Sequence, residues 1–503
     1  MAGAGGALLL RRARLTPLGG GEPAGVPGAG TDSPGRIVDL RVDGGLVVAV
    51  SAGPLRPRAG ETVVDADGGA LLPGLHDHHV HLLSAAAAAS SVPAGPPRVS
   101  DAAGLRAALR AAPGAGAHGW VRAVGYHPSV AGDLDRHGLD VLVADRPVRL
   151  QHRGGALWVL NSAALRLAGV EACPLPGVER DAAGHPTGRL WRMDDWLRRA
   201  AAIPRVPVDL AALGRAAAAR GVTGFTDATP GRSDAERRLL VEASRTGALP
   251  QRLTLMRPEP AAHGPPATDR GGIPAGERVR DGAVKLILDD DRLPDLDTLT
   301  ARIAAAHHGG APVAVHCVTR VQLILTLTAL ALAGHRRGDR IEHAAVVPPE
   351  LRDMLRAGGL TVVTQPNFIA ERGDRYLADI TDEDPAALYP AASLARAGVR
   401  LAAGTDAPFG DPDPWRAIRA ATDRRTAGGV VLGGGERLAA PAALALFLGT
   451  PTDPARPRAV RPGAPADLCL LDRPLAAALA DPSAAHVRRT FIAGVPVAAT
   501  PGE

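Results

Sequence analysis

The sequence predicts an α/β fold: a (β/α)8 TIM-like barrel with a small β-sandwich that both ends of the chain build together. Three observations support this prediction. The chain of 503 residues is long for one ordinary domain, but it is normal for a barrel with an appended domain. Its middle alternates apolar β-type segments with helical stretches rich in Ala, Leu and Arg. Both ends instead contain short β segments separated by turns rich in Gly and Pro.

The expected domain boundaries follow this change of pattern. Residues 1–72 are assigned to the first part of the sandwich, 73–450 to the barrel, and 451–503 to the second part of the sandwich. The stretch 19–35 is predicted to be a surface loop, because it is rich in Gly and Pro. Near the other end, residues 487–497 are predicted to form a hairpin that turns at Ala493-Gly494.

Eight apolar segments are candidates for the barrel strands. They are residues 75–81, 147–152, 222–227, 284–288, 313–316, 340–343, 361–365 and 399–406. The wide spacing of the first three predicts insertions after strands one and two. A doubly wound open sheet is the alternative, but it explains eight strands less well, and no Gly-rich dinucleotide turn follows an early strand.

Composition excludes several classes of function. The formal net charge of +5 is small and scattered, and no basic run is interleaved with aromatic residues, so nucleic-acid binding is not expected. No stretch approaches the roughly 18 uncharged apolar residues of a membrane span, so no membrane partner is expected. The three cysteines lie far apart, which argues against a disulfide framework. These features predict a cytoplasmic protein with a small-molecule substrate, and a homodimer remains an open arrangement.

A His-x-His pair at the end of the first predicted strand is the strongest local signal. Side chains at i and i+2 of a strand point the same way, so His79 and His81 project together, as two imidazole ligands of one metal require. His76 and His78 are interpreted as neighbours of the ligands. A His-x-His pair alone is often a surface accident, but this position favours a metal site.

Three further strand ends carry residues that bind metals. His316, His343 and Asp406 close or follow the fifth, sixth and eighth predicted strands. Each residue alone has a plain structural interpretation, as a capping or core histidine or as an aspartate that opens a turn. Together with the first pair they place four imidazoles and one carboxylate at the carboxyl ends of strands, where barrel active sites are assembled.

Lys285 is the only lysine in the chain, and it lies within the apolar fourth strand. Burial of an unpaired ammonium would cost several kcal/mol, so a special role is expected. A primary amine reacts with carbon dioxide to give an anionic carbamate, whose two oxygens can bridge two cations, whereas an arginine cannot do this. A neutral or salt-bridged lysine is the alternative.

The motifs of this chain resemble those of the amidohydrolase superfamily. More narrowly, they resemble the branch (amidohydrolase family 3) of YtcJ-like enzymes and N-substituted formamide deformylases. The matching segments cover nearly the whole chain. They are Pro73-Gly74 through His79-Val80-His81, Arg146-Pro147-Val148 with Trp158 through Leu165, Gly184 through Leu190, Gly221-Val222-Thr223 with Asp227, Val284-Lys285-Leu286, Ile341-Glu342-His343, Gly404 through Phe409, and Pro462 through Leu468.

The resemblance implies a role for each candidate ligand. His79 and His81 would bind one metal ion and His316 and His343 a second, with Lys285, carboxylated, as the bridge. Asp406 would be both a ligand and the catalytic acid/base. One departure concerns the stretch 153–158, which lacks a histidine that many relatives carry shortly before the Trp-Val-x-Asn-Ser element. The substrate of relatives is therefore not transferred to this chain.

The expected reaction is hydrolysis of a C–N bond other than a peptide bond, in an amide or an N-acyl or N-formyl small molecule. One or two divalent ions, with zinc as the expected metal, would lower the pKa of water towards roughly 7 and polarise the carbonyl. Asp406 would accept the water proton and give it to the leaving nitrogen. Isomerisation or decarboxylation at the same site, and a catalytically inactive scaffold, are the alternatives.

Loops after the strands are expected to contact the substrate. The candidates are Trp158 and Asn161 after the second predicted strand, and Asn367 and Arg372 after the seventh. A packing tryptophan, a turn asparagine and a solvated arginine are equally open interpretations of these residues.

Overall fold

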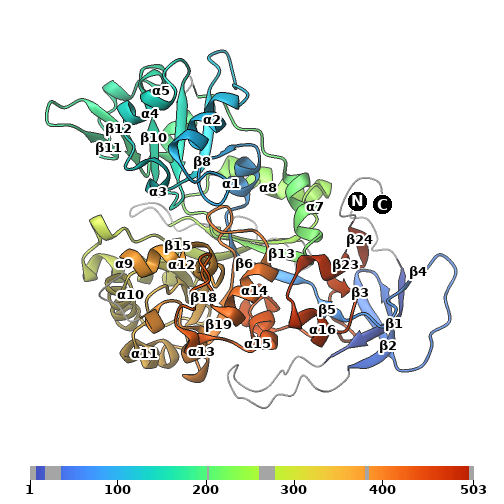
Figure 1. Ribbon diagram of the computed structural model, residues 1–503. Coiled ribbons are helices and arrows are strands. Elements are labelled where there is room, and N and C mark those ends of the chain that lie inside the picture. The colour runs from blue at the N-terminus through green and yellow to red at the C-terminus, as the bar shows by residue number, and fades with distance from the viewer. Residues whose placement is uncertain (1–6, 17–34, 201–202, 260–277, 380–384, 498–503) are drawn as a thin grey trace. The chain divides into compact units, whose positions relative to one another are not determined.

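The computed structural model describes residues 7–16, 35–200, 203–259, 278–379 and 385–497 (Figure 1). The chain forms two compact units. The barrel unit consists of Met1–Leu82 and Leu210–Glu503, and the inserted unit of Leu83–Asp209. The predicted loop at 19–35 lies outside the described residues, apart from Gly35. Within the described ranges, no helix combines the length and the apolar character needed to cross a bilayer.

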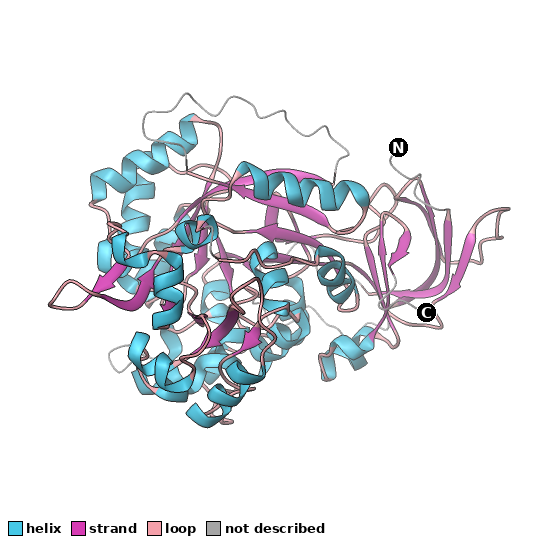
Figure 2. Ribbon diagram, turned by 90° about the horizontal axis from the view of Figure 1, so that it is seen from above, coloured by secondary structure: helices cyan, strands magenta, loops and turns pink. Residues whose placement is uncertain are grey.

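Two four-stranded sheets in the barrel unit form the sandwich, with strand orders β3-β2-β1-β4 and β24-β23-β22-β5. Their strands are β1 (Leu8–Leu15), β2 (Arg36–Asp43), β3 (Leu46–Ser51), β4 (Thr62–Asp65), β5 (Leu71–Pro73), β22 (Leu468–Leu471), β23 (Val487–Ile492) and β24 (Val495–Val497). Because β5 pairs antiparallel with β22, the second sheet joins the N-terminal and C-terminal parts of the chain. Figure 2 shows these strands in magenta, joined mainly by loops. One apolar cluster fills the space between the sheets, with Leu8, Leu40 and Leu71 packed against Leu468 and Phe491.

Two tight hairpins hold the sandwich strands in register. Gly44 and Gly45 join β2 to β3 with φ angles of 55° and 78°. Ala493 and Gly494 join β23 to β24 with φ angles of 51° and 78°, which confirms the predicted hairpin. Two successive residues with positive φ are the mark of a type I′ turn, whose twist matches that of the flanking strands.

The barrel sheet has eight parallel strands in the order β19-β18-β17-β16-β15-β14-β13-β6, which confirms the predicted fold class. The strands are β6 (Leu75–Val80), β13 (Val222–Asp227), β14 (Arg252–Arg257), β15 (Val279–Leu286), β16 (Val313–Cys317), β17 (Arg340–His343), β18 (Thr361–Thr364) and β19 (Arg400–Ala403). The sheet comes close to closure where β19 meets β6. There the N–H of Asp406 donates to the carbonyl of His79 over 2.8 Å, and the N–H of His81 donates to the carbonyl of Ala407 over 2.8 Å.

Helices follow most of the barrel strands, and one further helix lies between the sandwich strands β22 and β23. The principal ones are α7 (Leu210–Ala218), α8 (Asp234–Thr246), α9 (Leu296–His308), α10 (Arg320–Ala333), α11 (Arg352–Ala357), α12 (Asn367–Asp379), α13 (Ala391–Arg396), α14 (Pro414–Asp423), α15 (Ala440–Ala445) and α16 (Leu475–Ala480). Their ends carry the expected signals. For example, α8 begins with a capping box between Ser233 and Glu236 and ends at Gly247, whose φ is 78°.

One predicted barrel strand was wrong. Residues 147–152 form β9 (Val148–His152), which belongs to the sheet of the inserted unit and not to the barrel. The third barrel strand is instead β14, a short segment between Pro250 and Pro258 in which Leu253, Leu255 and Met256 are buried. A single long insertion, after β6, therefore replaces the two predicted after strands one and two.

The inserted unit is a mixed six-stranded sheet in the order β11-β12-β10-β9-β8-β7. Its other strands are β7 (Val92–Pro93), β8 (Val121–Tyr126), β10 (Leu157–Leu160), β11 (Val178–Arg180) and β12 (Pro186–Trp191). Its helices are α2 (Ala102–Ala111), α3 (Pro128–Ala131), α4 (Arg136–Leu142), α5 (Ser162–Ala168) and α6 (Asp194–Arg199), and α1 (Leu82–Ala89) leads into it from the barrel unit. Two separate apolar clusters, one containing Leu150 and Val159 and the other Trp158 and Leu160, pack within this unit.

Asp467 connects the sandwich to the base of the barrel. Its carboxylate accepts a hydrogen bond from the N–H of Ala493 and forms an ion pair with Arg252 of β14. Its carbonyl accepts a hydrogen bond from the N–H of Gly74, directly before β6. The segment 465–468, part of the matching stretch Pro462 through Leu468, thus holds the chain directly before the first barrel strand.

The shared sandwich core generates a stability prediction. Phe491→Ala should lower the free energy of unfolding by about 3–5 kcal/mol, because the fully buried ring fills the space between the two sheets. Val495→Ala on the next strand is the matched control, and its effect should stay within about 0.5 kcal/mol because Val495 is 44% exposed. Urea unfolding followed by circular dichroism measures both. Equal midpoints for the two variants would contradict the shared core.

Candidate functional site

The first barrel strand carries the predicted His-x-His pair in a buried position. His79 and His81 are 1% and 9% exposed, and their ring centroids lie 5.4 Å apart. Residues two apart in a strand share a face, so both imidazoles point to the same side of β6. His76 and His78 lie on the alternate face and stack on each other at 4.4 Å between ring centroids. The structure therefore separates the candidate ligands from their two histidine neighbours.

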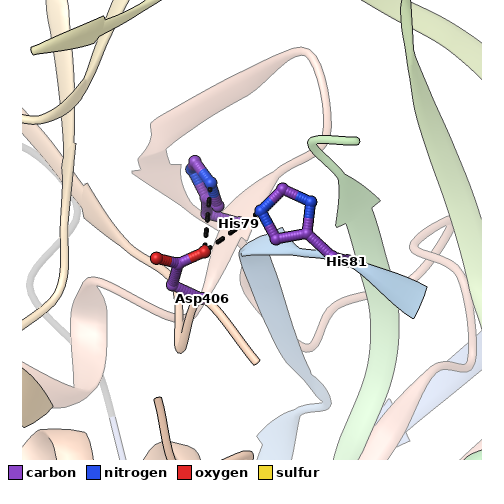
Figure 3. A group of neighbouring side chains, drawn as sticks. All are labelled: His79, His81 and Asp406. Atoms are coloured by element: carbon purple, nitrogen blue, oxygen red, sulfur yellow. Dashed lines mark ion pairs between the residues drawn. The ribbon is translucent and has the colours of Figure 1, made fainter. Parts of the chain in front are cut away.

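Asp406 reaches this pair from the end of the last barrel strand. Its Oδ1 lies 3.5 Å from Nε2 of His79 and 3.2 Å from Nε2 of His81 (Figure 3). Gly404 permits this approach, because a Cβ at that position would lie 2.4 Å from the backbone nitrogen of His79. Asp406 itself adopts a φ of 56°, a left-handed conformation that turns its carboxylate toward the histidines.

Asp77 holds the two strand ends together. Its carboxylate accepts hydrogen bonds from the N–H of Thr405 (3.0 Å), from the Thr405 hydroxyl and from the N–H of His79 (3.1 Å). Burial raises the pKa of Asp77 to about 6, and the hydrogen bonds oppose this rise. The sequence analysis did not single out Asp77, although its place between two histidines was visible.

A buried ion pair orients His79. Nδ1 of His79 contacts Oε2 of Glu342, and the guanidinium of Arg340 pairs with both oxygens of the same carboxylate. Burial disfavours ionisation of Glu342, but the charge of Arg340 and the hydrogen bond from His79 outweigh it and hold the pKa of Glu342 well below its usual value. An ionised Glu342 accepts a hydrogen bond from Nδ1–H of His79, which leaves the Nε2 lone pair of His79 directed toward Asp406. Sequence reasoning missed this role, although a charged pair in the apolar strand β17 is an unusual signal.

His316 and His343 lie next to the first pair of histidines. The ring centroid of His343 is 4.8 Å from that of His79 and 4.5 Å from that of His316. Nδ1 of His343 contacts Oε1 of Gln365 at 2.7 Å, and burial lowers the pKa of His343 to about 3. The imidazole of His343 is therefore neutral and able to offer a lone pair.

Lys285 lies on β15 and is 3% exposed. Its Nζ makes no hydrogen bond with any residue in the described ranges. Burial lowers the pKa of Lys285, while the negative charges of Glu342 and Asp406 act in the opposite direction. These interactions place Lys285 near Glu342 and Asp406.

Of the described residues, one group has ligand atoms close enough together to hold a metal ion. It consists of His79, His81 and Asp406, whose ligand atoms all lie within 4.8 Å of one another. Burial lowers the pKa of His79, so its imidazole is neutral at neutral pH. Oδ1 of Asp406 accepts no hydrogen bond from a described residue. Lone pairs that converge without a donor between them fit a divalent cation, for which imidazole and carboxylate are suitable ligands.

Two nominated substrate contacts lie in the inserted unit. Asn161 is fully buried and caps α5: Oδ1 accepts from the N–H groups of Val148 and Ala164, and Nδ2 donates to two carbonyls. Both polar atoms of the Asn161 side chain are thus hydrogen-bonded to backbone groups, which agrees with the interpretation of Asn161 as a turn residue. Trp158 is 4% exposed, and its Nε1 donates to Asp194 over 2.8 Å. Both residues follow β9 and not the second barrel strand.

The other two nominated contacts belong to α12 of the barrel unit, with Asn367 as its first residue and Arg372 within the helix. Nδ2 of Asn367 donates to the carbonyl of Thr405 over 3.1 Å, which braces the loop that carries Asp406. Oδ1 of Asn367 is buried and accepts no hydrogen bond from a described residue. Arg372 donates to the carbonyl of Phe409, and its guanidinium lies 3.8 Å from the ring centroid of Phe368. Both side chains support the loop after β19.

Comparison with known proteins agrees with this geometry. The chain is 26% identical to the N-substituted formamide deformylase of Arthrobacter pascens, over 92% of this chain and 96% of that protein. It is 27% identical to the putative amidohydrolase YtcJ of Bacillus subtilis (strain 168), over 58% of this chain and 61% of that protein. Among solved structures, an uncharacterized metal-dependent hydrolase from Pyrococcus furiosus shares the fold with a TM-score of 0.66 at 21% identity, covering 93% of this chain and 99% of the other.

The sequence profile of one family spans most of the chain. The match to the amidohydrolase family runs over residues 62–498 and so includes the barrel, the inserted unit and most of the C-terminal sandwich strands. The two named relatives come from the branch that the motifs resemble, which confirms that expectation. This chain therefore belongs to the amidohydrolase family.

Proposed function

We propose that this hydrolase of carbon–nitrogen bonds cleaves an amide in a small molecule, with an N-acyl or N-formyl amine as its substrate class. The convergence of His79, His81 and Asp406 on one point carries the proposal. The relative at 26% identity, an N-substituted formamide deformylase, supports this class of substrate. Hydrolysis of such an amide adds water across the C–N bond and gives a carboxylic acid and an amine.

The chain's own residues divide the work of this reaction. A divalent cation, with zinc as the expected metal, would supply Lewis acidity when bound by His79, His81 and Asp406. Burial disfavours ionisation of Asp406, but the surrounding imidazoles outweigh it, so the pKa of Asp406 is lowered. The ionised carboxylate of Asp406 accepts a proton from the attacking water and gives it to the leaving nitrogen. Glu342 keeps the Nε2 atom of His79 directed toward the reacting centre.

We further propose that the site holds two ions. His316 and His343 would bind the second ion, since His343 lies against both His79 and His316. The amine of Lys285 would add to carbon dioxide with loss of one proton, and the resulting carbamate would bridge the two ions. Support comes from the burial of Lys285, from the absence of a hydrogen-bond partner among the described residues, and from its place as the single lysine of the chain.

Metal content tests the first ligand set. His81→Ala should lose bound metal and activity, because it removes one of three converging ligand atoms. His185→Ala is the control, since His185 is an exposed histidine of the inserted unit and should keep both. Mass spectrometry of metals after dialysis measures the ions per chain. Full activity in a metal-free preparation would exclude this metal site.

Lys285 is tested by a pair of substitutions. Lys285→Ala and Lys285→Arg should both lose metal and most activity, because neither side chain can form a carbamate. A short carboxylic acid with bicarbonate should partly restore the alanine variant, since it supplies the missing oxygens. If Lys285→Arg keeps normal metal content and activity, the site is mononuclear and consists of His79, His81, His316 and Asp406.

The substrate class is tested by direct assay of the zinc-loaded protein. A panel of N-formyl and N-acyl amines should release free amine, measured by chromatography of the products. Asp406→Asn should reduce kcat by about 10²–10⁴-fold, the usual range for loss of a general acid/base. A product with unchanged mass would indicate isomerisation, and release of carbon dioxide would indicate decarboxylation. Either outcome would replace hydrolysis as the reaction.

A further inference from the structure

Two arginines lie side by side on one face of the sheet in the inserted unit. Arg122 of β8 and Arg149 of β9 are direct partners in the parallel ladder, so their side chains leave the sheet on the same side. Trp158 of β10 shares this face, because Leu160, two residues further along, is the ladder partner of Arg149. The guanidinium carbons of Arg122 and Arg149 lie 5.3 Å and 5.6 Å from the centroid of the Trp158 ring.

The guanidinium of Arg149 forms no ion pair with a residue that the structure describes, although the charge of Asp194 acts on it. Arg149 is 7% exposed, yet its guanidinium forms neither a hydrogen bond nor an ion pair with any residue of the described ranges. Arg122 is half-buried and donates to the carbonyl of Ala87 and the hydroxyl of Ser91, both uncharged. The nearby carboxylate of Asp194 accepts a hydrogen bond from Nε1 of Trp158. Within the part of the chain that the structure describes, it forms no ion pair with Arg122 or Arg149.

This arrangement is electrostatically unfavourable as it stands. Burial lowers the pKa of Arg149 to about 10, and burial together with the charge of Arg149 lowers the pKa of Arg122 to about 10, while the charge of Asp194 opposes both shifts. Both groups nevertheless remain charged at neutral pH. A buried charge without a partner is costly, and a like charge beside it increases the cost. Asp194 supplies one negative charge near the two guanidinium groups, so one positive charge stays uncompensated. Ordered water could satisfy the N–H donors, but it would not supply a second negative charge.

We propose that Arg122, Arg149 and Trp158 form a binding site for an oxyanion, the carboxylate or phosphate group of a small molecule. Two guanidinium forks present parallel N–H donors, which match the paired oxygens of such a group. The indole face supports the planar guanidinium groups and excludes water from one side. The site lies wholly within the inserted unit and shares no residue with the proposed metal site. It is therefore a second binding function, beyond the proposed amide hydrolysis.

Thermal unfolding of the zinc-loaded full chain tests the site with inorganic phosphate and acetate as probes. Wild type, Arg149→Met and Arg98→Met are compared in chloride, phosphate and acetate at equal ionic strength. Arg98 is an exposed arginine of the same unit and is the matched control. The midpoints of wild type and Arg98→Met should rise by a few degrees in phosphate or acetate, because a ligand of the folded state stabilises it. Arg149→Met should lose this rise.

This comparison distinguishes anion binding at Arg149 from a packing role of Arg149 and from anion binding at the metal. An anion that binds the metal raises the unfolding midpoint of all three proteins equally. The difference in midpoint between Arg149→Met and Arg98→Met therefore reports on Arg149. In chloride, Arg149→Met should unfold at or above the wild-type midpoint, because it removes a buried like charge. An arginine needed for packing would give the opposite result. If the midpoint rises in phosphate alone, the ligand group is a phosphate. If it rises in acetate, the ligand group is a carboxylate.

Two results would overturn the proposal. One is an equal anion-dependent rise in Arg149→Met and Arg98→Met, and the other is no rise in wild type. If Arg149→Met does not fold, crystals of the wild-type protein soaked in selenate decide the question. An anomalous selenium peak against the guanidinium groups of Arg122 and Arg149 is expected, and its absence refutes the site.

Discussion

The candidate site depends on one contact, where the last barrel strand meets the first. Asp77 binds the backbone and the hydroxyl of Thr405 and also the backbone of His79, so a single carboxylate joins the two strand ends. Gly404 leaves the space in which they approach. Without this contact, Asp406 would not face the histidines, because it is separated from them by more than 300 positions along the chain. The near closure of the barrel is therefore also the step that assembles the ligands.

A layer of buried charge lies behind the histidines and determines how they are presented. Arg340 neutralises Glu342, Glu342 contacts Nδ1 of His79, and Nε2 of His79 faces Asp406. Each group in this series offsets part of the free-energy cost of burying the next group. Such partners determine which nitrogen of a histidine carries the proton, and so which nitrogen can act as a ligand. The chain thus uses an ion pair in its core to prepare a neutral imidazole.

The fold and the candidate ligands could be read from the sequence where local pattern was sufficient. His79 and His81 stand two apart in an apolar strand, and His316, His343 and Asp406 end or follow apolar segments of the same kind. These are local features, and the rule that barrel sites form at carboxyl strand ends brings them together. Lys285 was visible for a different reason, as the single lysine of the chain.

What could not be predicted depends on contacts between distant segments. Residues 147–152 have the apolar pattern of a barrel strand, and only their pairing with β8 and β10 places them in another sheet. The short strand β14, between two prolines, has an apolar content similar to that of residues 147–152, so local pattern alone could not distinguish which of the two belongs to the barrel. The role of Glu342 required knowledge that its carboxylate faces β6. Asn161 looked available for substrate because most of its backbone partners lie in a segment that precedes it by more than ten residues.

The attachment of the inserted unit has a consequence for how this enzyme can change. The unit leaves the barrel after Leu82 and returns at Leu210, and the strands on either side, β6 and β13, are adjacent in the sheet. The backbone N–H of Leu82 is held by Asp227 at the end of β13, so the exit point is fastened one residue after His81. An insertion with apolar clusters of its own can be exchanged as a module without disturbing its host. Evolution or design can therefore remodel residues 83–209 while the ligand-bearing strands keep their positions.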